Sequence, residues 1–245
     1  MNTNKPSEET QRPAEKANRI GWKAILRFAI YILMMPLVLF LAAGTLNWIT
    51  AWILIGFTIA FTVVSRVIVA LKHPDLLAER ARYAEAQDAK GWDRLLVTLL
   101  ALYGPLVVWI VAGLDYRFGW SPSLPAAWQA AALVVMVLGY GVSAWAMAVN
   151  KFFSAVVRIQ KDRGHTTVTT GPYRLVRHPS YISGILAYLV LPVFLGTLWA
   201  LVPVGVTAIL TVVRTALEDR TLLAELDGYS DYAQRVRYRL VPGVW

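Results

Sequence analysis

Four long stretches without a charged residue constrain this chain more than any other feature of its sequence. They cover Phe28–Ser65, Leu95–Leu114, Phe118–Asn150 and Pro179–Val213. A membrane-spanning helix needs about 20 apolar residues, so the first stretch can hold two helices and the second can hold one. Lipid forces backbone polar groups to pair internally, and the alternating pattern of barrel strands is absent. The sequence therefore predicts an all-α, polytopic integral membrane protein with five or six transmembrane helices.

The chain divides into three regions. Residues 1–19 are polar, carry both signs of charge and have no apolar period, which predicts a disordered tail. Residues 20–149 are expected to hold four membrane helices, with a charged surface loop and a short helix over Lys72–Arg94. Residues 150–245 hold a large connection and then the uncharged stretch Pro179–Val213. That stretch is too long for one span, and its central prolines and glycine predict a helical hairpin with two short arms, followed by amphipathic cytoplasmic helices.

The distribution of basic residues predicts how the protein sits in the membrane. Of 24 Lys and Arg residues, only Arg117 falls on the side opposite the two termini. The positive-inside rule therefore places both termini and any site near them in the cytoplasm, at the inner membrane if the cell is bacterial. The same rule accounts for the net charge of +9, so no nucleic-acid partner is expected. Membrane lipids are the expected surroundings, and the basic residues of 235–239 are expected to rest on anionic headgroups.

Cysteine and histidine usage excludes several kinds of chemistry. The chain has no cysteine, which removes disulfides, thiolate nucleophiles and cysteine metal ligands. Its three histidines, His73, His165 and His178, are far apart in sequence. We therefore expect no metal site.

The densest group of polar and basic residues is Thr169–Tyr181, which leads directly into the last uncharged stretch. His178-Pro179 in this group also suits a plain helix cap, because proline favours the first helical position. Arg214 and Glu218, which follow the uncharged stretch, also suit a surface ion pair four residues apart. Tyr229 and Tyr232 are interpreted as packing residues.

The order and spacing of these groups resemble the isoprenylcysteine carboxyl methyltransferase family over roughly residues 150–245. These integral-membrane enzymes use S-adenosylmethionine and are related to the phospholipid N-methyltransferases. The resemblance rests on the following residues: His165-Thr166-Thr167-Val168, Gly171-Pro172-Tyr173-Arg174, Arg177-His178-Pro179-Ser180-Tyr181, Arg214, Glu218-Asp219, Tyr229 and Tyr232.

The resemblance implies a cytoplasmic pocket for S-adenosylmethionine, with Arg214 as the catalytic residue that faces the acceptor. The implied cofactor-binding residues are Gln160, His165, Thr166, Thr167, Val168, Tyr173, His178, Pro179, Ser180, Tyr181 and Glu218. Gln160 matches a cofactor-binding glutamine of the family only if the spacing between this glutamine and His165 is taken as two residues shorter. The family's acidic pair is usually two glutamates, whereas this chain has Glu218-Asp219, which leaves the role of Asp219 open.

Three classes of function follow from this reading. The first is a methyltransferase whose lipidic or prenylated acceptor enters from the bilayer and presents a carboxylate, an amine or a hydroxyl. Arg214 favours a carboxylate, because a guanidinium can grip one with two hydrogen bonds. The second is a membrane NADPH-dependent sterol or enone reductase, which would need more basic residues for the 2′-phosphate and is disfavoured by the proline after His178. The third is a non-catalytic membrane protein. The sequence does not indicate an oligomeric state.

Overall fold

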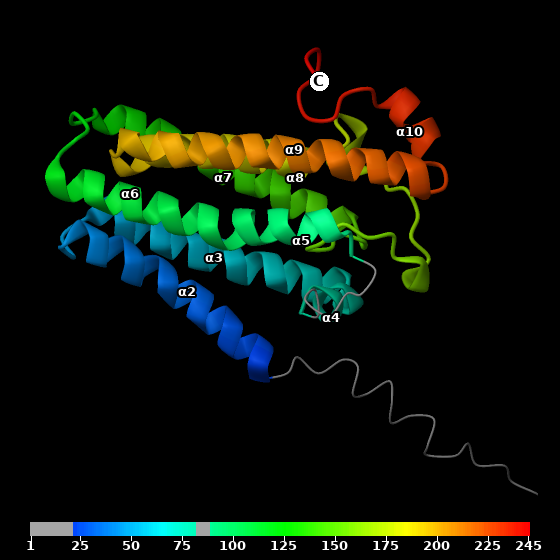
Figure 1. Ribbon diagram of the computed structural model, residues 1–245, viewed down its shortest axis with the longest axis horizontal. Coiled ribbons are helices and arrows are strands. Elements are labelled where there is room, and N and C mark those ends of the chain that lie inside the picture. Colours follow the sequence, from blue (N-terminus) through cyan, green and yellow to red (C-terminus); the bar gives the residue numbers. More distant parts are fainter. Residues whose placement is uncertain (1–21, 82–88) are drawn as a thin grey trace, which may run out of the picture.

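The computed structural model describes residues 22–81 and 89–245, and within them every regular element is a helix (Figure 1). The expected disordered tail, residues 1–19, lies outside the described residues. The first elements are α2 (Trp22–Ala43), α3 (Ile49–Lys72), α4 (Pro74–Ala81), α5 (Gly91–Thr98), the π-helical turn η3 (Leu99–Tyr103), α6 (Gly104–Phe118) and α7 (Ala126–Val149). The predicted helix before residue 90 is α4, and α5, η3 and α6 continue one another without a break.

The last region holds three α-helices and three short 3-10 turns. They are η4 (Lys161–Arg163), η5 (Gly171–Arg174), α8 (Pro179–Leu195), η6 (Leu198–Ala200), α9 (Leu201–Glu225) and α10 (Tyr229–Arg235). The predicted hairpin is present, but the prediction of two short arms is wrong. At 1.5 Å per residue α8 is about 26 Å long, whereas α9 is about 38 Å long. The amphipathic segment after Arg214 continues the second arm instead of forming a separate helix.

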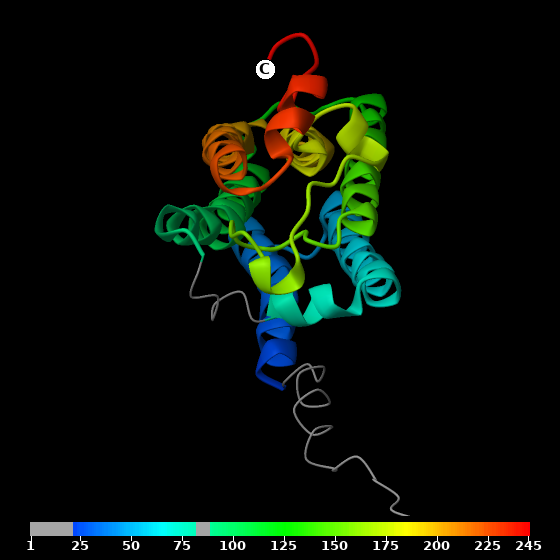
Figure 2. The same cartoon turned by 90° about the vertical axis from the view of Figure 1, so that its right-hand side faces the viewer.

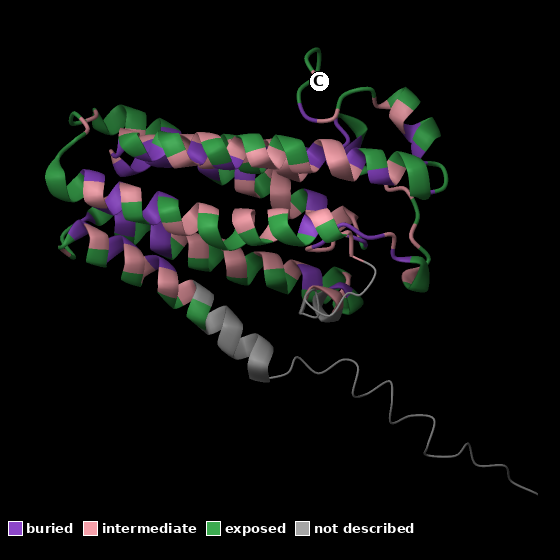
Figure 3. Cartoon of the chain, viewed as in Figure 1, coloured by how far each residue is buried: buried purple, intermediate pink, exposed green. Residues whose placement is uncertain are grey.

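The lengths and composition of these helices confirm a polytopic membrane protein. Four of them are long and apolar enough to cross a bilayer, and they cover Ile49–Lys72, Gly91–Phe118, Ala126–Val149 and Leu198–Glu225. Two shorter apolar helices, Ile32–Ala43 and Pro179–Leu195, bring the total into the expected range. Exposed positions lie along the outer sides of the bundle in Figure 3. Large apolar residues such as Leu37 and Ile209 are exposed and would meet lipid.

The long helices run back and forth along one axis, so the bundle has two distinct ends (Figure 1). At one end the connections 44–48, 119–125 and 196–200 are short. At the other end lie α4, α10 and the long segment 150–178, which crosses the bundle when it is viewed from that end (Figure 2). The second end is therefore the one that can form a site.

Small residues allow the helices to approach closely. A Cβ atom added at Gly139 of α7 would lie 2.7 Å from the Ser183 carbonyl oxygen of α8, and one at Gly113 of α6 would lie 2.5 Å from the Ala42 Cβ of α2. The Ser143 and Ser183 hydroxyls also bond across α7 and α8 at 2.8 Å. Gly139 and Ser143 thus allow a close helix contact of the kind that small residues support in lipid. Gly141 takes no part in it, because a Cβ added there would meet nothing within 4 Å.

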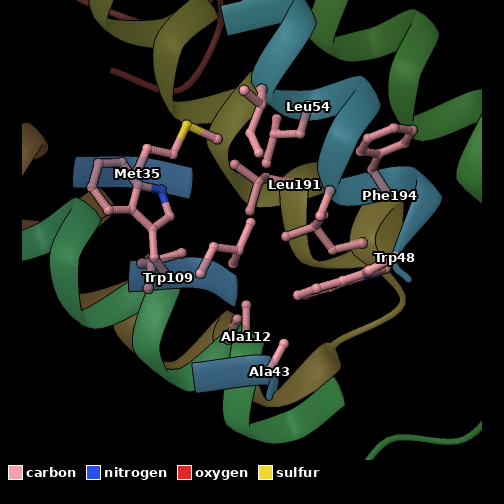
Figure 4. Packing of buried hydrophobic residues seen from close by; sticks show 14 of the residues in the cluster. Met35, Ala43, Trp48, Leu54, Trp109, Ala112, Leu191 and Phe194 are labelled. Atoms are coloured by element: carbon pink, nitrogen blue, oxygen red, sulfur yellow. The ribbon is translucent and has the colours of Figure 1, made fainter. Parts of the chain in front are cut away.

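The main apolar core lies in the half of the bundle near the short loops. Figure 4 shows Met35, Trp109 and Leu191 meeting there from three different helices, with Trp48 and Phe194 on the far side of the cluster. A second, smaller cluster at the other end contains Tyr173, Tyr229 and Tyr232. The first cluster fixes the bundle, and the second supports the site described next.

Candidate active site

A cavity of about 380 Å³ lies at the end of the bundle that carries the segment 150–178. Its volume is within the usual range for small-molecule sites. The predicted site residues that line it are Gln160, His165, Thr166, Thr167, Val168, Tyr173, His178, Ser180, Tyr181, Arg214 and Glu218. Pro179 does not line it and is instead the buried first residue of α8. The structure thus brings together every predicted site residue except Pro179.

Arg214 is held by an aspartate that the sequence did not single out. Its Nε donates to Asp93 Oδ1 at 2.7 Å, and its Nη2 donates to Asp93 Oδ2 at 3.2 Å and to the Ala155 carbonyl at 3.1 Å. Asp93 has no exposed surface, and its Oδ2 also accepts the backbone N–H of Val157 at 2.6 Å. Asp93 therefore ties α5, α9 and the segment 150–178 together at one point.

This arrangement removes the sequence-based reason for a carboxylate acceptor. The edge of the Arg214 guanidinium that grips a carboxylate with two hydrogen bonds is already occupied by Asp93. Its Nη1 donates to the Tyr181 hydroxyl at 2.7 Å, which leaves one further N–H on that nitrogen for a ligand. Arg214 can contribute one hydrogen bond to an acceptor, but not the bidentate grip.

Tyr181 joins Arg214 to Glu218. Its hydroxyl accepts a hydrogen bond from Arg214 and donates one to Glu218 Oε2 at 2.6 Å. The Tyr181 hydroxyl therefore bridges the two charged side chains. Glu218 is half-buried rather than solvated. The interpretation of Arg214 and Glu218 as a simple surface ion pair is therefore wrong, since Arg214 pairs with Asp93 and both side chains line the cavity.

Asp219, whose role the sequence left open, is a buried hub. It receives two hydrogen bonds from Arg177, at 2.8 and 2.9 Å, and one from Arg239 at 2.6 Å. The Tyr229 hydroxyl donates to it at 2.9 Å, and His178 Nε2 lies 3.2 Å away. A carboxylate with no exposed surface is thereby surrounded by charged and polar donors, as a buried charge requires.

Two backbone hydrogen bonds extend this hub into residues 236–240, which we call the C-terminal strap. The Arg177 N–H donates to the Tyr238 carbonyl and the His178 N–H to the Arg239 carbonyl, both at 2.9 Å. Arg177 Nη1 also donates to the carbonyls of Val236 and Arg237. The strap holds the chain just before α8. His178 occupies the cap position of α8, but its side chain makes no capping hydrogen bond and points to Asp219 instead.

The segment before η5 supplies a neutral histidine. His165 Nδ1 accepts the Gln160 backbone N–H at 3.3 Å, so its ring proton is on Nε2. Burial, and then the nearby Arg158 and Arg163, lowers the pKa of His165 from 6.5 to about 4. The Gln160 side chain donates to the Phe152 carbonyl at 2.8 Å and accepts from Arg163. Both hydrogen bonds are to protein groups, so they hold Gln160 in place in the cavity wall.

Helix α4 holds this segment from outside. Arg158 forms two hydrogen bonds with Glu79, at 2.9 and 3.0 Å, and Arg163 pairs with Asp75. The Lys72–Arg94 segment is therefore not simply a charged surface loop. Its acidic residues Glu79 and Asp93 point inward, and each pairs with an arginine that lines the cavity.

Tyrosines close the cavity on the α10 side. The Tyr173 hydroxyl accepts from Asn150 at 3.0 Å, and burial raises the pKa of Tyr173 above its ordinary value. The Tyr232 hydroxyl donates to the Tyr173 carbonyl at 2.7 Å. Tyr229 and Tyr232 pack in the small cluster as expected, and both also line the cavity.

Comparison with known families supports the sequence interpretation. The model of the isoprenylcysteine carboxyl methyltransferase (ICMT) family matches residues 131–224, which confirms the resemblance over that part of the chain. No curated protein matches the chain. The matched part includes all the predicted site residues, but it excludes Asp93 and the C-terminal strap, which the structure adds to the site.

Proposed function

We propose that this protein is an integral-membrane methyltransferase that uses S-adenosylmethionine to methylate the carboxylate of a lipidic or isoprenylated acceptor. The observation that carries the proposal is the convergence of the family-like residues on one cavity. Segments separated by more than 50 residues, from Gln160 to Glu218, contribute side chains to the same 380 Å³ space. Polar residues that served only as solvated surface would not be expected to gather around one cavity.

The residues present fit the cofactor. When bound, S-adenosylmethionine supplies an electrophilic methyl group on a sulfonium cation. Glu218 places a carboxylate in the cavity wall, where it can neutralise a positive ligand, and Tyr173, His178 and Tyr181 offer aromatic faces. Neutral His165 adds an Nε2–H donor, and the hydroxyls of Thr166 and Thr167 belong to the same wall.

A carboxylate acceptor suits the chemistry that these side chains can provide. Its oxygen is already deprotonated near neutral pH, so the protein does not need a general base. Holding the reacting atoms about 3 Å apart and excluding water can supply most of the acceleration. The ICMT match supports the same acceptor class.

The cavity also offers a path for a lipidic acceptor. Val97, Leu100 and Ala101 of α5 and η3 form an apolar part of its wall. The neighbouring Leu95 and Leu102 are exposed on the outside of the bundle, where lipid would be. We propose that the acceptor's hydrocarbon chain enters along this wall, and that this end of the bundle faces the cytoplasm.

Isothermal titration of the purified protein in detergent tests the cofactor assignment. We expect S-adenosylmethionine to bind and NADPH not to compete. Loss of a charge-assisted hydrogen bond costs about 1.5–3 kcal/mol, so Glu218→Gln should weaken S-adenosylmethionine roughly 10- to 150-fold. Glu225→Gln is the matched control, because Glu225 lies on the same helix, pairs with Lys90 and does not line the cavity.

Two results would contradict the proposal. Binding of NADPH without S-adenosylmethionine would favour a reductase. Equal affinities in Glu218→Gln and the wild type would remove Glu218 from the cofactor site. Glu218→Gln is a cleaner probe than His178→Ala, because His178 also supports the buried Asp219.

A further inference from the structure

Arg80, in the last turn of α4, is a cation on the cavity wall that has no acidic partner among the described residues. Four arginines line the cavity, namely Arg80, Arg158, Arg177 and Arg214. Arg158 pairs with Glu79 and Asp162, Arg177 with Asp219, and Arg214 with Asp93. Within residues 22–81 and 89–245, no carboxylate pairs with Arg80.

The contacts of Arg80 are with neutral groups. Its Nη1 donates to the Phe153 carbonyl at 3.1 Å, and its guanidinium carbon lies 5.5 Å from the centre of the Phe153 ring. These contacts use a small part of its five N–H donors. Burial, and then repulsion from Arg66, lowers the pKa of Arg80 from its usual value. Arginine nevertheless stays protonated in proteins, so the wall of the cavity carries a positive charge that no carboxylate pairs with in the part of the chain that the structure describes.

The location of Arg80 separates it from the acidic part of the cavity. Figure 2 shows α4 and α9 on opposite sides of the segment 150–178, so Arg80 and Glu218 approach the cavity from different directions. Arg80 contacts Phe153, which also lines the cavity. The cavity therefore offers a negative group to one ligand and a positive group, beside an aromatic ring, to another.

We propose that Arg80 binds the carboxylate of the lipidic acceptor, a role that rests on the methyltransferase function proposed above. Its guanidinium retains free donors for a carboxylate, whereas the fork of Arg214 is occupied by Asp93. Methylation would form an O–CH₃ bond as the S–CH₃ bond of S-adenosylmethionine breaks, so the carboxylate becomes a neutral ester and the sulfonium leaves as the neutral thioether S-adenosylhomocysteine. The ester loses its ion pair with Arg80, so the same residue that holds the acceptor favours release of the product.

Competition binding in nanodiscs tests this role. Radiolabelled S-farnesylcysteine with a free carboxylate serves as the tracer, and the unlabelled acid and its carboxamide serve as competitors. In the wild type the acid should bind at least 10-fold more tightly than the carboxamide. In Arg80→Gln this preference should fall to within about 2-fold because only the acid loses affinity, and Arg80→Lys should retain part of it because the charge remains.

Arg174→Gln is the matched control, since it removes one positive charge from an exposed residue near the site that does not line the cavity. It should keep the full preference for the acid. An unchanged preference in Arg80→Gln would overturn the proposal and leave Arg80 as a support for Phe153. Loss of S-adenosylmethionine affinity in Arg80→Gln, with acceptor binding intact, would also overturn it, because the bound carboxylate would then belong to the cofactor.

The assay separates this inference from the proposed function. Acceptor binding is measured without the cofactor, so it can be tested even if S-adenosylmethionine does not bind. Failure of the wild type to bind S-adenosylmethionine would refute the methyltransferase. A wild type that methylates the acid while Arg80→Gln keeps its preference would refute only the role of Arg80.

Discussion

The two ends of the helix bundle both bury carboxylates, but different kinds of hydrogen-bond donor bind these carboxylates at each end. At the end with short loops, Asp115 is 1% exposed and accepts from the Ser121 N–H and hydroxyl, at 2.8 and 2.6 Å, and from the Trp199 N–H at 3.0 Å. These donors are all neutral. At the cavity end, Asp93 and Asp219 are bound mainly by guanidinium groups.

This difference shows how buried carboxylates play different structural parts at the two ends. Asp115 joins the connections 119–125 and 196–200 through backbone and hydroxyl groups. At the cavity end, the side chains of Arg177 and Arg214 reach the acids, and both also line the cavity. The charged pairs therefore hold side chains on the cavity wall, whereas the neutral donors join two connections directly.

The largest expected contrast between the ends is their position relative to the membrane. Single cysteines at Ser123 and at Thr167, placed in this cysteine-free chain, lie at opposite ends of the bundle. With an impermeant maleimide applied to intact cells, we expect complete labelling at Ser123 and none at Thr167, because within residues 22–81 and 89–245 Arg117 is the only basic residue near the short connections. Labelling of Thr167→Cys from outside would reverse the assignment of the cytoplasmic end.

The same substitution at the two hubs should give unequal losses of stability. Asp219→Asn leaves Arg177 and Arg239 without a carboxylate, which should lower the free energy of unfolding by about 3–5 kcal/mol. Asp115→Asn removes charge-assisted bonds from neutral donors and should cost about 1.5–3 kcal/mol. Unfolding in mixed micelles of increasing SDS content compares the two variants. Equal losses would mean that the type of partner does not distinguish the ends.

The smallest expected effect is kinetic and confined to the cavity end. Asp93→Asn keeps the shape of the side chain but weakens its hold on Arg214, so methyl transfer should fall by at least ~10-fold, or about 1.4 kcal/mol in the activation barrier. S-Adenosylmethionine affinity should stay within a few-fold, and Asp115→Asn should leave the rate unchanged. Combining Asp93→Asn with Arg214→Lys should cost little more than either change alone, since both act through one interaction. Additive losses would show that Asp93 acts independently of Arg214.

Local sequence patterns predicted the helices and the family-like residues well. The uncharged stretches indicated the membrane helices because the need to satisfy backbone groups in lipid leaves few alternatives. Tyr173, His178, Tyr181, Arg214 and Glu218 were found because their order along the chain matches a family. These features are encoded within short distances in sequence or carried by a known motif.

Asp93 and Arg80 were missed for a physical reason. Both lie in Lys72–Arg94, whose density of charge normally indicates a solvated segment. The burial of Asp93 depends on Arg214, which comes 121 residues later, and Arg80 contacts Phe153, 73 residues later. The local spacing of apolar and polar residues along the sequence does not indicate pairings over such distances. An acid directly preceding a long uncharged stretch, as Asp93-Arg94 does here, is the one signal that could have drawn attention to this residue.

The attachment of the C-terminal strap has a consequence for how the protein is made. Arg177 pairs with the Arg237 carbonyl, which lies 60 residues further along the chain, and with the strap backbone next to it. The strap follows α9 in sequence, so it leaves the ribosome after α8 and α9. Asp219 on α9 can therefore pair with Arg177 and His178 before the strap carbonyls reach them. Insertion of these helices and completion of the hub become two separate steps, and a chain truncated before the strap would keep the helices but lose the carbonyl contacts of Arg177 and His178.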